Sequence, residues 1–142
     1  MKLDALQGTW VGTCELWLDP LGDTGQTSPC RLEVEATGVN YTWHHDGAEQ
    51  KGSLVPTSDG ANFTDTFHSA STMHCCSIPG SRGVVAVEGS YQETWGWRIG
   101  IAHRTPTDEL VLQMTNIAPW GEEARAVRMV AKREGTAKTE AS

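Results

Sequence analysis

The chain has 142 residues, of which 38% are hydrophobic and 20% are charged, and its formal net charge is −7. This length suits one globular domain with a buried core, and no apolar run approaches the roughly 20 residues of a membrane-spanning helix. We therefore expect no membrane partner, and the acidic balance argues against nucleic acid, whose phosphates are bound by clustered Lys and Arg.

The N-terminal residues carry one basic side chain and no continuous apolar stretch before a small-residue cleavage site. We therefore expect no signal peptide and a cytoplasmic location. Residues 1–6 have room for about one helical turn before Gly8.

The dominant pattern along the chain is an alternation of period two, broken at short intervals by turn residues. Apolar positions alternate from Trp10 to Leu18, and after a loop at 19–26 they alternate with charged residues from Cys30 to Ala36. Asp46-Gly47 predicts a hairpin turn. A weaker strand follows this turn and ends near Val55. Further strands are predicted over residues 39–45, 62–68, 71–76, 84–91, 94–103, 109–117 and 124–133.

About ten short antiparallel strands must bury their apolar faces and dispose of their edges, and a closed barrel does both. We therefore predict an all-β fold, a single antiparallel up-and-down β-barrel over residues 1–133 with a flexible polar tail over 134–142. A β-sandwich is the alternative, but it would need several long crossovers, whereas the turns here are short.

Both ends of the barrel segment resemble known families. Leu6-Gln7-Gly8-Thr9-Trp10 resembles the Gly-x-Trp start of lipocalins and fatty-acid-binding proteins, in which the Trp closes one end of the barrel. Residues 126–132 are similar to their final strand, where an Arg points inward. The resemblance implies an inward Arg128, either stacked on Trp10 or bound to a ligand carboxylate.

The middle of the chain, residues 62–68 and 89–99, resembles bacterial calycin-type domains of unknown function. Together these segments imply a calycin-like, lipocalin-like barrel. The chain departs from lipocalins in lacking a secretion signal, and from haem-carrying nitrobindin-like barrels in lacking a matching motif around a proximal His.

Aromatic and polar side chains on these strands are the candidate ligand contacts. Trp95 and Trp97 share one face of their strand and Arg98 lies on the other, and the sequence leaves open which face points inward. The expected ligand-binding residues are Trp43, His68, Tyr91, Trp95, Trp97, Arg98, His103, Met114, Asn116 and Arg128.

Candidates for catalysis are few. His68 follows Asp65 and Phe67 at the end of a predicted strand, where a barrel-mouth His beside aromatic walls can act as a donor or base. If the barrel is an enzyme of the isomerase, cyclase or lyase type, we expect His68 with Asp65 or Glu93 to be the acid–base pair. The sequence contains no nucleophile elbow, phosphate loop or His-Glu-x-x-His motif.

The four cysteines lack the paired spacing of a zinc site and are too few for a disulfide scaffold. We expect free thiols, with a Cys14–Cys30 bridge as the alternative. His74 precedes Cys75 and Cys76, but adjacent strand residues point to opposite faces, so we expect no metal site there and no cofactor.

The leading functional hypothesis is intracellular binding of a small hydrophobic or amphipathic molecule in the barrel interior. The alternatives are a cavity enzyme, a haem-binding barrel and a packed barrel without ligand. The expected partner is the small molecule, and a homodimer is the alternative to a monomer.

Overall fold

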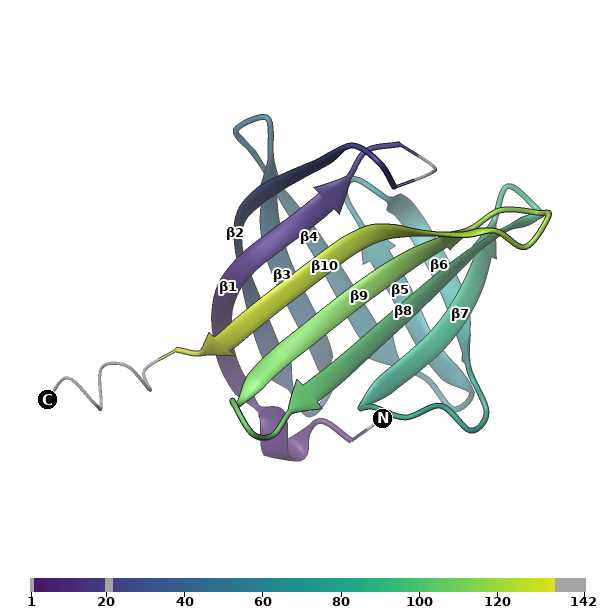
Figure 1. Cartoon of the computed structure of the whole chain (residues 1–142). Helices are drawn as coiled ribbons and strands as arrows, with labels where there is room; N and C mark the ends of the chain where they lie inside the picture. The colour runs from purple at the N-terminus through teal and green to yellow at the C-terminus, as the bar shows by residue number, and fades with distance from the viewer. Residues whose placement is uncertain (1, 20–21, 135–142) are drawn as a thin grey trace, which may run out of the picture.

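The computed structural model describes residues 2–19 and 22–134, and there the fold is all β apart from one short 3₁₀ turn. Ten strands run antiparallel around one closed barrel in the order β1-β10-β9-β8-β7-β6-β5-β4-β3-β2 (Figure 1). The elements are η1 (Asp4–Leu6), β1 (Gly8–Trp17), β2 (Gly25–Glu35), β3 (Gly38–His45), β4 (Ala48–Pro56), β5 (Gly60–Asp65), β6 (Ser69–Ser77), β7 (Val85–Tyr91), β8 (Trp95–Arg104), β9 (Glu109–Ile117) and β10 (Glu123–Arg133). The predicted up-and-down barrel is confirmed, and the sandwich alternative is wrong.

Some predicted strand boundaries need correction. β2 begins at Gly25, inside the predicted loop, and β5 ends at Asp65, so that His68 lies in the turn between β5 and β6. Most of the predicted tail, residues 135–142, lies outside the described residues. Among the described residues, no helix is both long and apolar enough to span a membrane.

The barrel interior is filled by alternate residues of the strands. Side chains with essentially no accessible surface leave no room for a water molecule beside them, so the middle of the barrel is packed rather than hollow. Full burial of each such side chain stabilises the fold by roughly 1.5 to 3 kcal/mol. The largest of them are Trp10, Trp43, Phe63, Leu16, Leu32, Leu54, Ile99, Ile101, Leu110, Leu112, Met114 and Met129.

One end of the barrel, called here the η1 end, is closed by η1 and by the side chain of Trp10. The indole Nε1 of Trp10 donates a hydrogen bond of 2.9 Å to the carbonyl oxygen of Leu6. The guanidinium of Arg133 lies 4.4 Å from the centre of the Trp10 ring and donates from Nε to Asp108 Oδ2 at 2.9 Å. The expected stacked cation is therefore present, but it is Arg133.

The orientation predicted for Arg128 is wrong. A register shift between Arg125 and Val127 changes the alternation of β10, so that Val127 and Met129 point into the core. Arg128 pairs with Glu15 and Gln113 on the outer face. Arg133 pairs with Trp10 and shares its inward face.

The sheet is weakest between β6 and β7. The two strands form only two register pairs within the described chain, Cys76 with Glu88 and Ser77 with Val87, both toward the η1 end. Farther along, the side chains of Met73 and Cys75 fill the space over Gly89. A Cβ at Gly89 would lie 2.8 Å from both sulfur atoms, so a larger residue there would have to displace these two side chains.

Candidate functional site

The opposite end of the barrel, called here the mouth, carries a continuous set of aromatic side chains. It lies at the end of the barrel where β1 connects to β2, β3 to β4, β5 to β6, β7 to β8 and β9 to β10. Each ring of the set has its centre within about 6.4 Å of another. This mouth cluster comprises Trp43, His45, Phe63, Phe67, His68, Tyr91, Trp95, Trp97 and Trp120.

His68 lies at the centre of the mouth cluster. Its ring stacks on Trp43 at 5.6 Å between centroids and lies 5.0 Å from Trp97, while Phe67 packs edge-on at 4.9 Å. Only 12% of the His68 side chain is exposed. The imidazole is therefore fixed by aromatic packing rather than left free to rotate.

Asp65 is the one fully buried charged residue of the described chain, with 2% of its surface exposed. Its Oδ2 accepts hydrogen bonds from the Tyr41 hydroxyl at 2.5 Å and from Trp43 Nε1 at 3.4 Å. Its Oδ1 accepts from the backbone N–H groups of Phe67 and His68 at 2.8 and 2.9 Å. The carboxylate thereby holds the β5–β6 turn and places the His68 ring.

These contacts determine the ionisation of the carboxyl and the phenol. Burial alone would raise the pKa of Asp65, but the neighbouring His68 imidazole and the Tyr41 hydroxyl outweigh burial and lower the pKa below its ordinary value. Burial and the negative Asp65 raise the pKa of Tyr41 well above its ordinary value. At neutral pH the pair is therefore a phenol donating to a carboxylate.

Two buried polar atoms of the mouth cluster have no hydrogen-bond partner among the described residues. They are Trp97 Nε1 and His68 Nδ1. His68 Nδ1 lies 3.4 Å from Asp65 Oδ1, close enough for electrostatic attraction but without hydrogen-bond geometry. A buried unpaired donor costs roughly 1 to 3 kcal/mol, so each such atom requires a physical explanation.

The rim of the mouth is polar and half-buried. The Tyr91 hydroxyl donates a hydrogen bond to Asn116 Oδ1, and Trp95 packs edge-on against the exposed Trp120 at 5.8 Å. His45 Nδ1 lies 2.6 Å from the side-chain amide of Gln26. The site thus combines apolar ring faces with accessible polar atoms.

The fold brings together six of the ten side chains expected to contact a ligand and separates the other four. Met114 lies deeper in the packed core, and His103 lies at the η1 end beside Trp10. Arg98 and Arg128 are on the outer face. The six at the mouth are Trp43, His68, Tyr91, Trp95, Trp97 and Asn116.

The register of β8 shows which face of this strand points into the barrel. Trp97 is 5% exposed and points inward, on the same face of β8 as the buried Ile99. Arg98 points outward and forms ion pairs with Glu88 at 3.4 Å and Glu123 at 2.8 Å. The cation is therefore balanced by protein carboxylates on the outer surface.

Tyr41, His45 and Trp120 were not among the expected site residues, and Tyr41 matters most because it donates to Asp65. A signal was available, because Tyr41 lies two positions before Trp43 on the same strand face, and a buried Asp65 needs donors. Phe63 and Phe67 were anticipated only as general aromatic walls. Their places in the cluster depend on how β5 lies beside β4 and β6.

The cysteines are free thiols, so the alternative Cys14–Cys30 bridge is not formed. Cys75 is buried and Cys76 is exposed, which confirms that the two adjacent thiols cannot point to one site. Burial raises the pKa of Cys14 and of Cys30 to about 12, and that of Cys75 to about 11. These three thiols are core side chains.

The outer wall carries a groove of about 360 Å³ over β7, β8 and β9. The wall is hollowed there because small side chains, among them Ala86, Gly100 and Ala102, face outward between larger ones. Of the four buried side-chain atoms without a hydrogen-bond partner in the described chain, two lie in the mouth cluster, and His44 Nδ1 and Arg128 Nε lie outside it. Arg128 lines a second outer groove of about 250 Å³. The mouth is the better candidate site because only there do two such atoms lie together among aromatic rings.

Fold and site together define a closed antiparallel β-barrel with a packed middle, one sealed end and one aromatic end that contains a buried carboxylate. Comparison with protein-family models and with curated proteins found no match to this chain. A functional proposal therefore depends on the residues of the chain itself.

Proposed function

We propose that the protein binds a small amphipathic molecule at the mouth, with its apolar part against the aromatic rings and an acceptor oxygen directed at Trp97 Nε1. This retains the hypothesis of a barrel that binds a small apolar ligand, and moves the ligand from the middle of the barrel to one end. Kinship with calycins is part of the same proposal, supported by the Gly8-x-Trp10 start and the meander of strands.

The observation that carries the proposal is the unpartnered indole N–H of Trp97 inside an aromatic cluster. An acceptor on a ligand would satisfy this donor, and the faces of the surrounding rings would cover the ligand's apolar body. The packed middle of the barrel limits the ligand to a size that fits among the mouth residues or displaces flexible ones, such as Met73 at the β6–β7 seam.

The test compares two probes that differ in one acceptor oxygen, 2-tetralone and tetralin. We expect 2-tetralone to bind about tenfold more tightly, which corresponds to one hydrogen bond of about 1.4 kcal/mol. Binding is followed by Trp fluorescence and by the indole N–H signal of Trp97, which should move downfield only with 2-tetralone. In Trp97→Phe the two probes should bind equally.

The matched control is Trp17→Phe, because Trp17 packs against Arg125 on the outer face of the barrel and does not belong to the mouth cluster. This variant should keep the preference for 2-tetralone. The ratio of the two affinities is compared within each variant, so a general loss of packing after Trp97→Phe does not affect the result. Absence of saturable binding by either probe, or an equal preference in both variants, would refute the proposal and favour a packed barrel without ligand.

A second candidate function, acid–base catalysis, is favoured by the Asp65–His68 pair. The carboxylate lies 3.4 Å from His68 Nδ1, and the other ring nitrogen has no partner among the described residues. In this arrangement Asp65 positions and stabilises the imidazole, and His68 Nε2 exchanges the proton. Deuterium incorporation into the acidic C–H groups of 2-tetralone in D₂O tests this role, and His68→Gln should abolish any acceleration. A rate equal to that in buffer would exclude His68 as a base toward this compound.

A further inference from the structure

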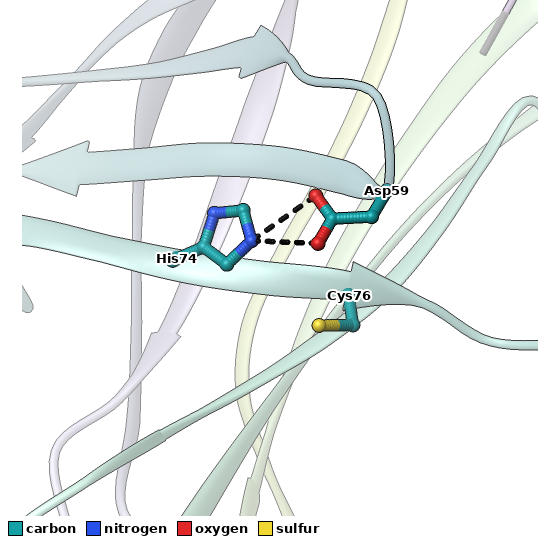
Figure 2. A group of neighbouring side chains, drawn as sticks. All are labelled: Asp59, His74 and Cys76. Atoms are coloured by element: carbon teal, nitrogen blue, oxygen red, sulfur yellow. Dashed lines mark hydrogen bonds and ion pairs between the residues drawn. The ribbon is translucent and has the colours of Figure 1, made fainter.

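A cluster of metal-ligating side chains lies on the outer wall, at the other end of β5 and β6 from the mouth. His74 and Cys76 are alternate outward residues of β6, and Asp59 lies in the turn before β5. Figure 2 shows the Asp59 carboxylate facing the edge of the His74 ring, with the Cys76 sulfur on the same strand as His74. One ligand atom from each residue lies within 4.8 Å of the others.

The backbone brings these three residues together. Gly60 pairs with Cys76, and a Cβ at Gly60 would lie 1.9 Å from the carbonyl oxygen of Cys75. Glycine therefore allows the start of β5 to approach β6 closely. This approach places the Asp59 carboxylate over the outward face of β6.

Two of the three ligands are held by further hydrogen bonds. His74 Nδ1 lies 2.9 Å from Asn62 Oδ1, which can accept its proton, while Nε2 faces the Asp59 carboxylate, so a metal ion at Nε2 would take the place of a proton there. The Thr57 hydroxyl donates to Asp59 Oδ1 at 3.0 Å. Partners of this kind orient the ligands in known metal sites, because they fix the imidazole tautomer and the carboxylate rotamer.

The spacing suits tetrahedral zinc. Zinc bonds of about 2.0 to 2.1 Å to nitrogen or oxygen and 2.3 Å to sulfur place ligand atoms about 3.3 to 3.6 Å apart. His74 Nε2 lies 3.1 and 3.2 Å from the two carboxylate oxygens of Asp59. The Cys76 sulfur is within 4.8 Å of both other ligand atoms, and its side chain is exposed, so binding requires only that this thiol turn toward the centre.

We propose that Asp59, His74 and Cys76 bind one Zn²⁺ ion through a carboxylate oxygen, Nε2 and a thiolate, with the fourth position open to water or to a ligand from another molecule. The sequence-based objection to a metal concerned Cys75 with Cys76, and it does not apply here, because Cys75 points inward. The ion would join the turn before β5 to β6, next to the short β6–β7 pairing. Binding should therefore also raise the melting temperature.

The test uses the full chain with Zn²⁺ and with Co²⁺ as a spectroscopic substitute. Calorimetry should give one Zn²⁺ per chain, and Co²⁺ should produce a thiolate-to-metal charge-transfer band that Zn²⁺ displaces. Cys76→Ser should remove the band, and both Cys76→Ser and His74→Gln should weaken Zn²⁺ binding by about tenfold or more. All three ligands are exposed, so these variants should fold as the parent does.

The matched control is His103→Gln. His103 Nε2 lies 2.7 Å from Asp108 Oδ1, which makes a second His–Asp pair, but no cysteine belongs to that pair in the described chain. This variant should leave the Co²⁺ band and the Zn²⁺ affinity unchanged. A parent protein without the charge-transfer band, or a Cys76→Ser variant with parental Zn²⁺ affinity, would overturn the proposal.

Discussion

Replacement of Asp65 should destabilise the barrel more than replacement of an exposed acidic residue, because Asp65 accepts four hydrogen bonds in a buried position. Asp65→Ala leaves the Tyr41 hydroxyl and the Trp43 indole as buried donors without an acceptor, and two backbone N–H groups in the turn lose theirs. At roughly 1 to 3 kcal/mol for each buried donor, we expect a loss of about 4 kcal/mol or more.

Asp65→Asn removes the negative charge of this side chain and keeps its shape. The amide oxygen can still accept from the two backbone N–H groups, and the Tyr41 hydroxyl can rotate to accept from the amide nitrogen. The Trp43 indole then faces another donor, so we expect an intermediate loss of about 2 kcal/mol. The control is Asp46→Asn, because Asp46 lies in the β3–β4 turn at the same end with 85% of its side chain exposed. Its effect should stay within about 0.5 kcal/mol.

Urea unfolding, followed by Trp fluorescence and by circular dichroism, measures these differences at equal m-values. The predicted order of stability is parent and Asp46→Asn, then Asp65→Asn, then Asp65→Ala. Stability of Asp65→Ala within 1 kcal/mol of the control, about one typical hydrogen bond, would show that the carboxylate does not hold the mouth together.

The same comparison has a defined pH dependence. The pKa of Asp65 is lower in the folded protein than its ordinary value of 3.8, so its ionisation stabilises the fold above that value. This contribution is lost as the pH falls through the folded pKa. The stability difference between the parent and Asp65→Asn should therefore be constant near neutral pH and shrink below about pH 4. A difference that grows on acidification would contradict the assigned direction of the pKa shift.

Two further predictions concern the η1 end and the thiols. Arg133→Met should lower the free energy of unfolding by about 1 to 3 kcal/mol, since it removes the stack on Trp10 and the hydrogen bonds to Asp108 and to the Ala5 carbonyl. Arg128→Met on the outer face of the same strand should change it by less than about 0.5 kcal/mol, and equal effects in urea unfolding would mean that the register of β10 is misassigned. Ellman's reagent at pH 8 should react rapidly with one thiol per folded chain, Cys76, and with all four after unfolding, because burial keeps the pKa of the other three at about 11 to 12. Cys76→Ser should abolish the rapid phase, and a second fast-reacting thiol would contradict the burial of Cys14, Cys30 or Cys75.

The barrel could be predicted from the sequence because most of its strands are short, alternate in period two and are separated by tight turns. The segment from Cys30 to Val34 illustrates this, since its apolar residues are buried and alternate with charged ones. The residues at which the strands end could be predicted less well than the strands themselves. His68 lies beyond the end of β5 because Asp65 binds the backbone of the following turn, a tertiary effect without a local pattern.

The error at Arg128 has a specific cause. Counting in steps of two from Ala124 places Ala126, Arg128 and Val130 on one face, as the resemblance to calycins also implied. The irregularity between Arg125 and Val127 changes the phase once, and every later residue of β10 then points the other way. A bulge of this kind is set by the pairing with β9, so it could not be read from one strand.

The two ends of the barrel differ in whether their buried polar side chains have hydrogen-bond partners. At the η1 end the buried indole N–H of Trp10 has a carbonyl partner, and His103 has Asp108. At the mouth, Trp97 Nε1 is buried without a hydrogen-bond partner, and His68 Nδ1 has only its 3.4 Å contact with Asp65 Oδ1, although a fully apolar mouth would avoid that cost. Buried polar groups that weaken a fold are retained most readily where they serve binding or chemistry. The contrast between Trp10 and Trp97 therefore supports the mouth as the place where this barrel meets another molecule.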